Sequence, residues 1–201
     1  MEQVANLILD ALIKTVVTKA ELNRLDAEER HVEVEDGVII DSDWGTTWIH
    51  LLIIRTLFRI LDAHVVAHKL GEVFMDGGRY RLRGDETDVH RAYIPDLSFV
   101  RAARLPQNFD WRSSDLPLTP DLAVEVISPA QSNKKLLQRI AYYLESDAEE
   151  AWAVYPNREE LHQYRDNDDG VRVYRGDDLI DTRRLFPGLE LKVSMLFVTP
   201  S

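Results

Sequence analysis

Two stretches of the sequence, Ile94-Pro-Asp-Leu-Ser-Phe-Val100 and Leu122-Ala-Val-Glu-Val-Ile-Ser128, decide the fold. Both are short and apolar at most positions, which predicts two β-strands. A strand that is apolar on both faces lies in the middle of a sheet whose two faces are covered. Each strand carries one acidic residue against this pattern, Asp96 in the first and Glu125 in the second.

These two acids are candidate metal ligands. Strand alternation places Asp96 on the face of Ser98, and Glu125 on the face of Ala123 and Ile127. An ionised carboxylate on a covered face is costly unless it is paired or bound to a metal. A buried salt bridge, or a position at the wet end of a strand, would explain either residue alone. Two acids in neighbouring strands favour a shared site for a hard divalent cation such as Mg²⁺.

The rest of the pattern predicts an α/β (α+β) domain, in which helices pack on a mixed sheet. A capping box, Thr18-Lys-Ala-Glu21, begins one helix, and the long apolar helix at 47–64 is expected to be the central buried one. Asp36-Gly37 is expected to turn a hairpin at 31–40. Further helices are expected at 3–15 and 132–145, and further strands at 71–75, 79–83, 151–155, 161–165 and 171–174, so the C-terminal half is rich in strands.

Composition limits the class of protein. The chain has 201 residues, of which 45% are hydrophobic and 29% charged, as in one ordinary globular domain. It has no cysteine, and its start lacks the features of a signal peptide. The longest apolar stretch, 48–54, is too short to span a membrane, so we expect a cytoplasmic protein without membrane contact. The net charge of −11 opposes nonspecific attraction to DNA, which would need positive charge gathered locally.

A set of segments in a fixed order carries a resemblance. The segments resemble the Uma-type putative restriction endonuclease family of the PD-(D/E)xK nuclease superfamily, from about residue 18 to the C-terminus. They are Tyr93-Ile-Pro-Asp-Leu-Ser-Phe-Val100, Pro120-Asp-Leu-Ala-Val-Glu-Val-Ile-Ser-Pro129, Tyr142-Tyr-Leu144, Glu150-Ala-Trp-Ala-Val-Tyr-Pro156, Val32-Glu-Val-Glu-Asp-Gly37, His50 and Leu185-Phe-Pro-Gly-Leu189.

The resemblance implies a restriction-endonuclease-like mixed sheet flanked by helices, over one domain at 18–201 that follows an N-terminal helical extension at 1–17. It implies that Asp96 and Glu125 bind Mg²⁺ or Mn²⁺, and that Glu33 is a further acid of the site. In such nucleases the metal neutralises the scissile phosphate and activates water. An exposed strand carboxylate remains the alternative for Glu33. His50 matches a family position beside the acids, although a histidine at a helix start can equally have no catalytic part.

The sequence departs from the superfamily motif at the lysine. The position two residues after Glu125 is Ile127, and the lysine that the family carries on the following helix, four residues before a tyrosine, is Arg139 before Tyr143. Arginine stays protonated, so it could stabilise charge on a phosphate but could not act as a base. On a helical wheel Arg139 and Tyr143 flank the apolar stripe of Leu136, Leu137, Ile140 and Leu144, whereas Lys135 faces solvent. An ordinary surface arginine is the alternative for Arg139.

Arg79, Arg81 and Arg83 alternate along one predicted strand, which would place three guanidinium groups on one face near the cleft. Such a row could contact the phosphates of DNA, although a solvated strand face is the plainer explanation.

Two functions follow as hypotheses. The first is a metal-dependent DNA endonuclease, weakened by the replacement of the lysine, and the second is an inactive nuclease-fold protein with a binding or regulatory role. Nucleases that cut both strands often act as symmetric dimers, so a homodimer is expected in the first case.

Overall fold

Two β-sheets and three helices make up the fold of the computed structural model, which describes residues 16–41, 47–75, 77–128, 132–168 and 170–199. The helix predicted at 3–15 lies outside these residues, and the division of the chain at residue 17 stays a prediction.

The larger sheet has six strands in the order β11-β10-β9-β8-β6-β3. Its central pair, β8 and β9, is parallel, and its other neighbours are antiparallel. The strands are β3 (Gly71–Met75), β6 (Leu97–Arg101), β8 (Leu122–Val126), β9 (Glu150–Tyr155), β10 (Glu160–Arg165) and β11 (Val171–Arg175).

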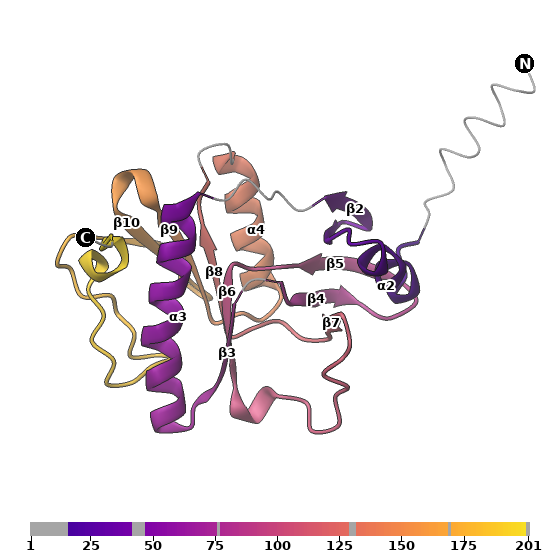
Figure 1. Cartoon of the computed structure of the whole chain (residues 1–201), viewed down its shortest axis with the longest axis horizontal. Coiled ribbons are helices and arrows are strands. Elements are labelled where there is room, and N and C mark those ends of the chain that lie inside the picture. The colour runs from indigo at the N-terminus through magenta and orange to yellow at the C-terminus, as the bar shows by residue number, and fades with distance from the viewer. Residues whose placement is uncertain (1–15, 42–46, 76, 129–131, 169, 200–201) are drawn as a thin grey trace, which may run out of the picture.

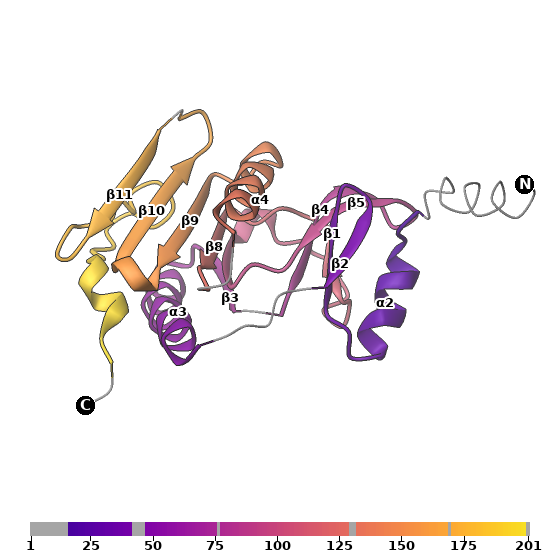
Figure 2. The ribbon, with the colours of Figure 1, turned by 90° about the horizontal axis from the view of Figure 1, so that it is seen from above.

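The smaller sheet has five strands in the order β2-β1-β5-β4-β7, with α2 (Lys19–Ala27) packed on it (Figures 1 and 2). Residues 94–96 lead from β5 in this sheet directly to β6 in the larger one. The strands are β1 (Val32–Glu35), β2 (Val38–Asp41), β4 (Arg79–Gly84), β5 (Val89–Tyr93) and β7 (Asp115–Leu116).

Helices α3 (Trp48–His68) and α4 (Asn133–Glu145) lie on opposite faces of the larger sheet, as Figure 2 shows. Leu122, Val124 and Val126 of β8 belong to the buried cluster under α3, whereas Ala123 belongs to the cluster under α4. The prediction that β8 is a central strand covered on both sides is therefore confirmed. A single turn of 3₁₀ helix occurs at Ala102–Arg104, at Pro156–Arg158 and at Val193–Phe197.

Local sequence signals explain several of these elements. Thr18 caps α2 as the capping box predicts, since its hydroxyl accepts a hydrogen bond from the Glu21 N–H at 3.2 Å. Thr47 caps α3 in the same way. Asp36 and Gly37 both have positive φ, which is the geometry of a tight hairpin turn between β1 and β2.

The strand predicted at 94–100 is wrong at its start. Pro95 has no N–H to donate to a ladder, and the chain changes sheets at this point, so β6 begins only at Leu97. The short strands β5 and β7 were not predicted at all.

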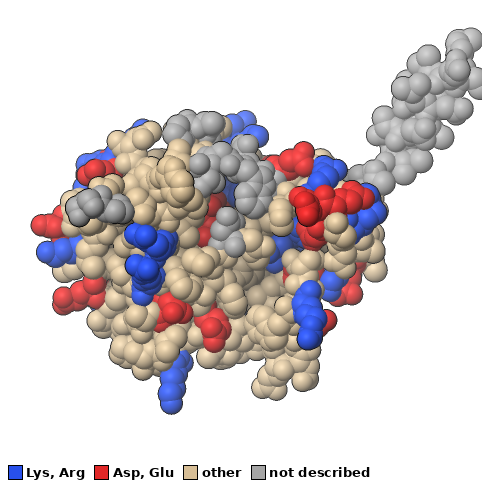
Figure 3. Space-filling model, in the orientation of Figure 1, with Lys and Arg blue, Asp and Glu red and all other residues tan. Residues whose placement is uncertain are grey.

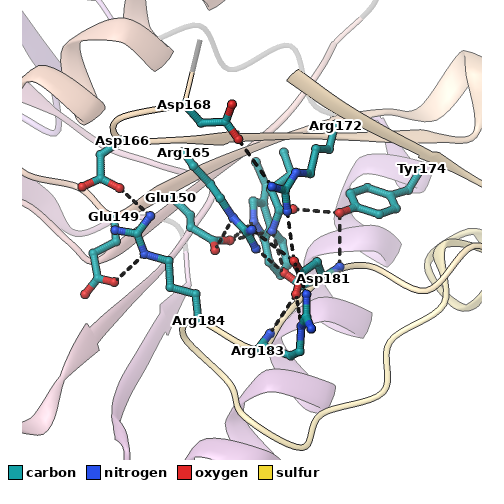
Figure 4. A network of polar contacts seen from close by, with 12 residues as sticks. Glu149, Glu150, Arg165, Asp166, Asp168, Arg172, Tyr174, Asp181, Arg183 and Arg184 are labelled. Atoms are coloured by element: carbon teal, nitrogen blue, oxygen red, sulfur yellow. Dashed lines mark hydrogen bonds and ion pairs between the residues drawn. The ribbon is translucent and has the colours of Figure 1, made fainter. Parts of the chain in front are cut away.

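Ion pairs connect the segment after β11, through Asp181 and Arg184, to the larger sheet (Figure 4). Asp181 accepts hydrogen bonds from Arg165, Arg172 and Arg183, and the Arg183 and Arg165 guanidinium groups hold the pKa of its carboxyl well below the ordinary range. The fully buried Glu150 accepts from Trp152, Gln163 and Arg165. These contacts join β9 to β10, and they join β10 and β11 to Asp181 in the segment that follows β11.

Candidate metal and catalytic site

Four elements bring charged side chains together where the two sheets meet. Glu33 comes from β1 of the smaller sheet, Asp96 from the connection between the sheets, Glu125 from β8, and Arg139 from α4. All four were singled out from the sequence and its resemblance. Arg139 contacts Glu33 and Glu125 directly, and Asp96 is held beside Glu125 by the Val126 N–H.

Asp96 is held by the backbone of the neighbouring strand. Its Oδ2 accepts a hydrogen bond from the Val126 N–H at 2.6 Å, and His50 Nε2 lies 3.3 Å from the same oxygen. The Val126 N–H follows Glu125 in the chain, so this hydrogen bond fixes Asp96 next to Glu125. Asp96 does not share a strand face with Ser98 as predicted, because it lies before β6 begins.

Glu125 is buried under α4. Its Oε1 accepts a hydrogen bond from the Tyr143 hydroxyl at 2.8 Å and lies 3.5 Å from Arg139 Nη1. Burial raises the pKa of Glu125 to about 8, and the nearby Asp96 and Glu33 carboxylates add to the rise, while Arg139 opposes it.

Arg139 binds Glu33 with both terminal nitrogens. Nη1 lies 2.9 Å from Oε1 of Glu33 and Nη2 lies 2.5 Å from its Oε2. The guanidinium carbon also lies over the Tyr93 ring, 4.9 Å from its centre. Burial raises the pKa of Glu33, and this rise is opposed by Arg139 and by the Ile94 N–H, which donates to Oε1. Glu33 is thus a buried partner of Arg139 and not an exposed strand carboxylate.

The phase of α4 agrees with the helical wheel in most respects. Leu136, Ile140 and Tyr143 are its buried residues, and Lys135 is exposed as predicted. Leu137, which the wheel placed in the apolar stripe, is instead 49% exposed. The buried stripe is therefore turned toward Tyr143, which brings this tyrosine onto Glu125 and Arg139 onto the junction of the two sheets.

The predicted row of exposed arginines is not present. Only 2% of the Arg79 side chain is exposed, and it binds Asp26 with two nitrogens and the Val32 carbonyl with a third. Arg81 is also buried, with its Nε 3.2 Å from Asp115. Only Arg83 is exposed, because the pairing of β4 with β5 is irregular after Arg81. Two of the three guanidinium groups are thus engaged inside the fold, so we do not propose the row as a DNA contact.

Replacing these arginines should separate their roles. We expect Arg79→Ala to lower the free energy of unfolding by about 3 kcal/mol, because it leaves a partly buried carboxylate without its partner. Arg83→Ala should change it by less than about 0.5 kcal/mol, since the side chain is exposed. Urea unfolding curves of both variants measure this, and equal midpoints for the two would contradict it.

Sequence reasoning missed the residues that hold α4 against the β1–β2 hairpin. The Tyr142 hydroxyl donates to Asp36, and the Arg91 guanidinium stacks on the Tyr142 ring while it also binds Asp36. The Tyr93 hydroxyl donates to Glu35 in the same hairpin. A pair of adjacent tyrosines on a helix, Tyr142 and Tyr143, was the available signal, but it does not say which elements they join.

The chain matches a known protein family over most of its length. Residues 20–194 match the model of the Uma2 family, described as "Putative restriction endonuclease". The chain belongs to this family. A crystal structure of a putative nuclease belonging to DUF820 from Anabaena variabilis ATCC 29413 is similar, with a TM-score of 0.74 and 20% identity over 90% of this chain and 97% of that one. At this identity the likeness shows the fold, and it confirms the mixed α/β class. No curated protein matches the chain.

A family of nucleases implies a divalent metal ion and suggests DNA as the substrate. Within the described ranges, no group of three or more His, Cys, Asp or Glu side chains is arranged to hold a metal ion. No helix in the described part of the chain is long and apolar enough to cross a membrane.

The acids fit a divalent cation in charge and in available oxygens. Glu33 and Glu125 contact the Arg139 guanidinium and Asp96 is held beside Glu125, so the three acids and one arginine leave two negative charges when all three acids are ionised. The contacts of Asp96 use Oδ2 and those of Glu125 use Oε1, so within the described residues the other oxygen of each remains for a cation. Two protein ligands are a normal number for Mg²⁺, which usually keeps water or phosphate oxygens in its remaining positions.

Proposed function

We propose that this protein is a metal-dependent endonuclease that hydrolyses phosphodiester bonds of DNA with slow turnover. The observation that carries the proposal is the convergence of Asp96 and Glu125 at the junction of the two sheets, where three acids meet one arginine. Mg²⁺ or Mn²⁺, when bound there, would neutralise the scissile phosphate and lower the pKa of a water molecule.

The chain's own residues would hold the two acids in place. The Val126 N–H fixes Asp96, and the Tyr143 hydroxyl fixes Glu125, so each carboxylate keeps one oxygen oriented for the cation. His50 would support Asp96 from the start of α3. Arg139 would supply positive charge near the phosphate, but it stays protonated and so leaves the removal of a proton from water without a side-chain base.

A second candidate function is binding of metal or DNA without turnover. The observation that favours it is the pairing of both Arg139 terminal nitrogens with Glu33, together with Ile127 at the motif position of the lysine. The visible face of the molecule shows basic and acidic side chains interspersed, without a broad basic area (Figure 3). A homodimer, as a nuclease that cuts both strands would need, remains part of the first proposal.

Nicking of supercoiled plasmid separates the two functions. We expect the purified protein to nick plasmid slowly in Mg²⁺ or Mn²⁺, and Asp96→Ala to reduce the rate by at least about 100-fold, since removal of a group that holds the charge-stabilising ion is among the largest catalytic losses. Glu72→Ala, which removes an exposed carboxylate from the nearby strand β3, serves as the matched control and should nick like the wild type.

Equal nicking by wild type and Asp96→Ala would show that the activity does not come from this site. Binding of metal by the wild type without any nicking would favour the second function.

A further inference from the structure

Arg139 contacts two carboxylates, and its contact with Glu33 is shorter and more complete than its contact with Glu125. Its Nη1 is 2.9 Å from Glu33 Oε1 and 3.5 Å from Glu125 Oε1, while Nη2 contacts Glu33 alone. The same nitrogen therefore faces both acids, but the full two-point contact goes to Glu33. Bidentate pairing of this kind is the strongest contact a guanidinium makes with a carboxylate.

The position of Glu33 is fixed by its own strand and by the connection between the sheets. Glu33 lies in β1 opposite Ile40 of β2, and its side chain is almost fully buried. Its Oε1 also accepts the Ile94 N–H at 2.9 Å. The Tyr93 ring under the guanidinium adds a further contact on the side of Glu33.

Glu125 would otherwise be the natural partner of Arg139. It is buried and close, and its Oε1 accepts a 2.8 Å hydrogen bond from the neutral Tyr143 hydroxyl and a single longer contact, 3.5 Å, from Arg139 Nη1. If Arg139 closed onto Glu125, the pair would be neutral and Glu125 would attract a cation much less. The attraction of a cation to Glu125 thus depends on where Arg139 is held.

We propose that Glu33 is a positioning residue, which holds Arg139 to a single long contact with Glu125 and so keeps the Glu125 carboxylate available to a divalent cation. This inference rests on the proposed function, in that it takes Asp96 and Glu125 as the cation ligands. It assigns Glu33 to Arg139 and not to the metal.

The inference predicts that Glu33 controls the affinity for metal through its shape as well as its charge. Glu33→Gln removes the charge, and Glu33→Asp keeps it on a side chain one methylene shorter, which cannot make the same two-point contact. Both should release Arg139 toward Glu125. We expect both to weaken Mn²⁺ binding, Glu33→Gln by about 10–100-fold, as is usual when a group that orients a ligand is lost, and Glu33→Asp by at least severalfold.

Calorimetric titration with MnCl₂ at pH 7 measures this without relying on activity. Glu35→Gln is the matched control, because Glu35 lies two residues along β1 and contacts Tyr93 instead of Arg139. It should bind Mn²⁺ like the wild type. Urea unfolding of each variant establishes that it is folded before it is titrated.

Wild-type affinity in Glu33→Asp would overturn the inference, since it would show that Glu33 acts by charge alone. A crystal structure of metal-free Glu33→Gln adds a direct test: Arg139 should pair with Glu125, and a guanidinium that stays over Tyr93 would also overturn it. If the wild type itself binds no Mn²⁺, the proposed function fails together with this inference. If the wild type binds and both Glu33 variants bind equally well, this inference alone fails.

Discussion

The double variant Asp96→Asn, Glu125→Gln should bind no Mn²⁺ in a calorimetric titration in which the wild type gives a saturable signal. The reason is that the two substitutions remove both carboxylates that are proposed to bind the cation, while they preserve the shape of each side chain. Neutral amide oxygens are weak ligands for a hard cation when no carboxylate accompanies them. Undiminished binding by the double variant would place the metal elsewhere.

Loss of binding must be separated from loss of fold, and the buried state of Glu125 allows this. Burial raises the pKa of Glu125 from an ordinary value of 4.5 to about 8, so in the metal-free protein the folded state holds a proton that the unfolded state has lost between these values. The contribution of Glu125 to stability is therefore largest at low pH and is lost as the pH rises toward 8.

Glu125→Gln carries a neutral side chain at every pH and lacks this loss. In a buffer with a chelator at pH 8, we expect the single variant to be at least as stable as the wild type, and the wild type to lose stability from about pH 5 to pH 8 relative to the variant. Urea unfolding at several pH values measures both. A variant that is much less stable at pH 8 would mean that the missing Mn²⁺ signal reports unfolding.

The strand pattern predicted the core of the fold because the alternation of side chains along one strand shows which faces of the sheet are buried. Leu122, Val124 and Val126 on one face and Ala123 on the other could be assigned to two covered faces before it was known which helices cover them. Glu125 stood out against this pattern, and the structure places it under α4 with the side chains of that helix. The capping residue Thr18 was readable for the same reason, because a cap is a local arrangement.

The arginine row shows where the pattern fails. An alternation of arginine in a strand is equally compatible with a solvated face and with a buried face whose partners are acidic. The partners here are Asp26, in a helix about fifty residues earlier, and Asp115, in a short strand that the sequence did not reveal. Pairing between residues so far apart depends on the tertiary arrangement, and no local signal contains it.

The candidate site lies between these two cases. The strand pattern indicated Asp96 and Glu125, and the resemblance added Glu33 and Arg139. Neither indicated that Arg139 pairs with Glu33 across 106 positions of the chain, or that the Val126 N–H holds Asp96. Those contacts arise because the chain passes from one sheet to the other at Pro95, which brings the hairpin of the smaller sheet against α4.

Arg139→Lys should raise the single-turnover rate of plasmid cleavage. Lysine is the residue that the superfamily motif carries, and it is a compact ammonium that can lose its proton, whereas the guanidinium of arginine stays charged. General-base assistance is typically worth about 10²–10⁴ in rate, so a wild type that lacks it has that much to gain.

The control comes from the same helix. Lys135 is exposed and lies one turn before Arg139, so Lys135→Ala should leave the rate unchanged even though it removes a basic residue near the site. We expect an increase of at least about tenfold for Arg139→Lys on supercoiled DNA in Mg²⁺, the low end of what base assistance supplies. If Lys135→Ala abolishes cleavage while Arg139→Lys leaves it unchanged, then Lys135 and not Arg139 occupies the place of the motif lysine, and the exposed end of α4 would have to move onto the acids when DNA binds.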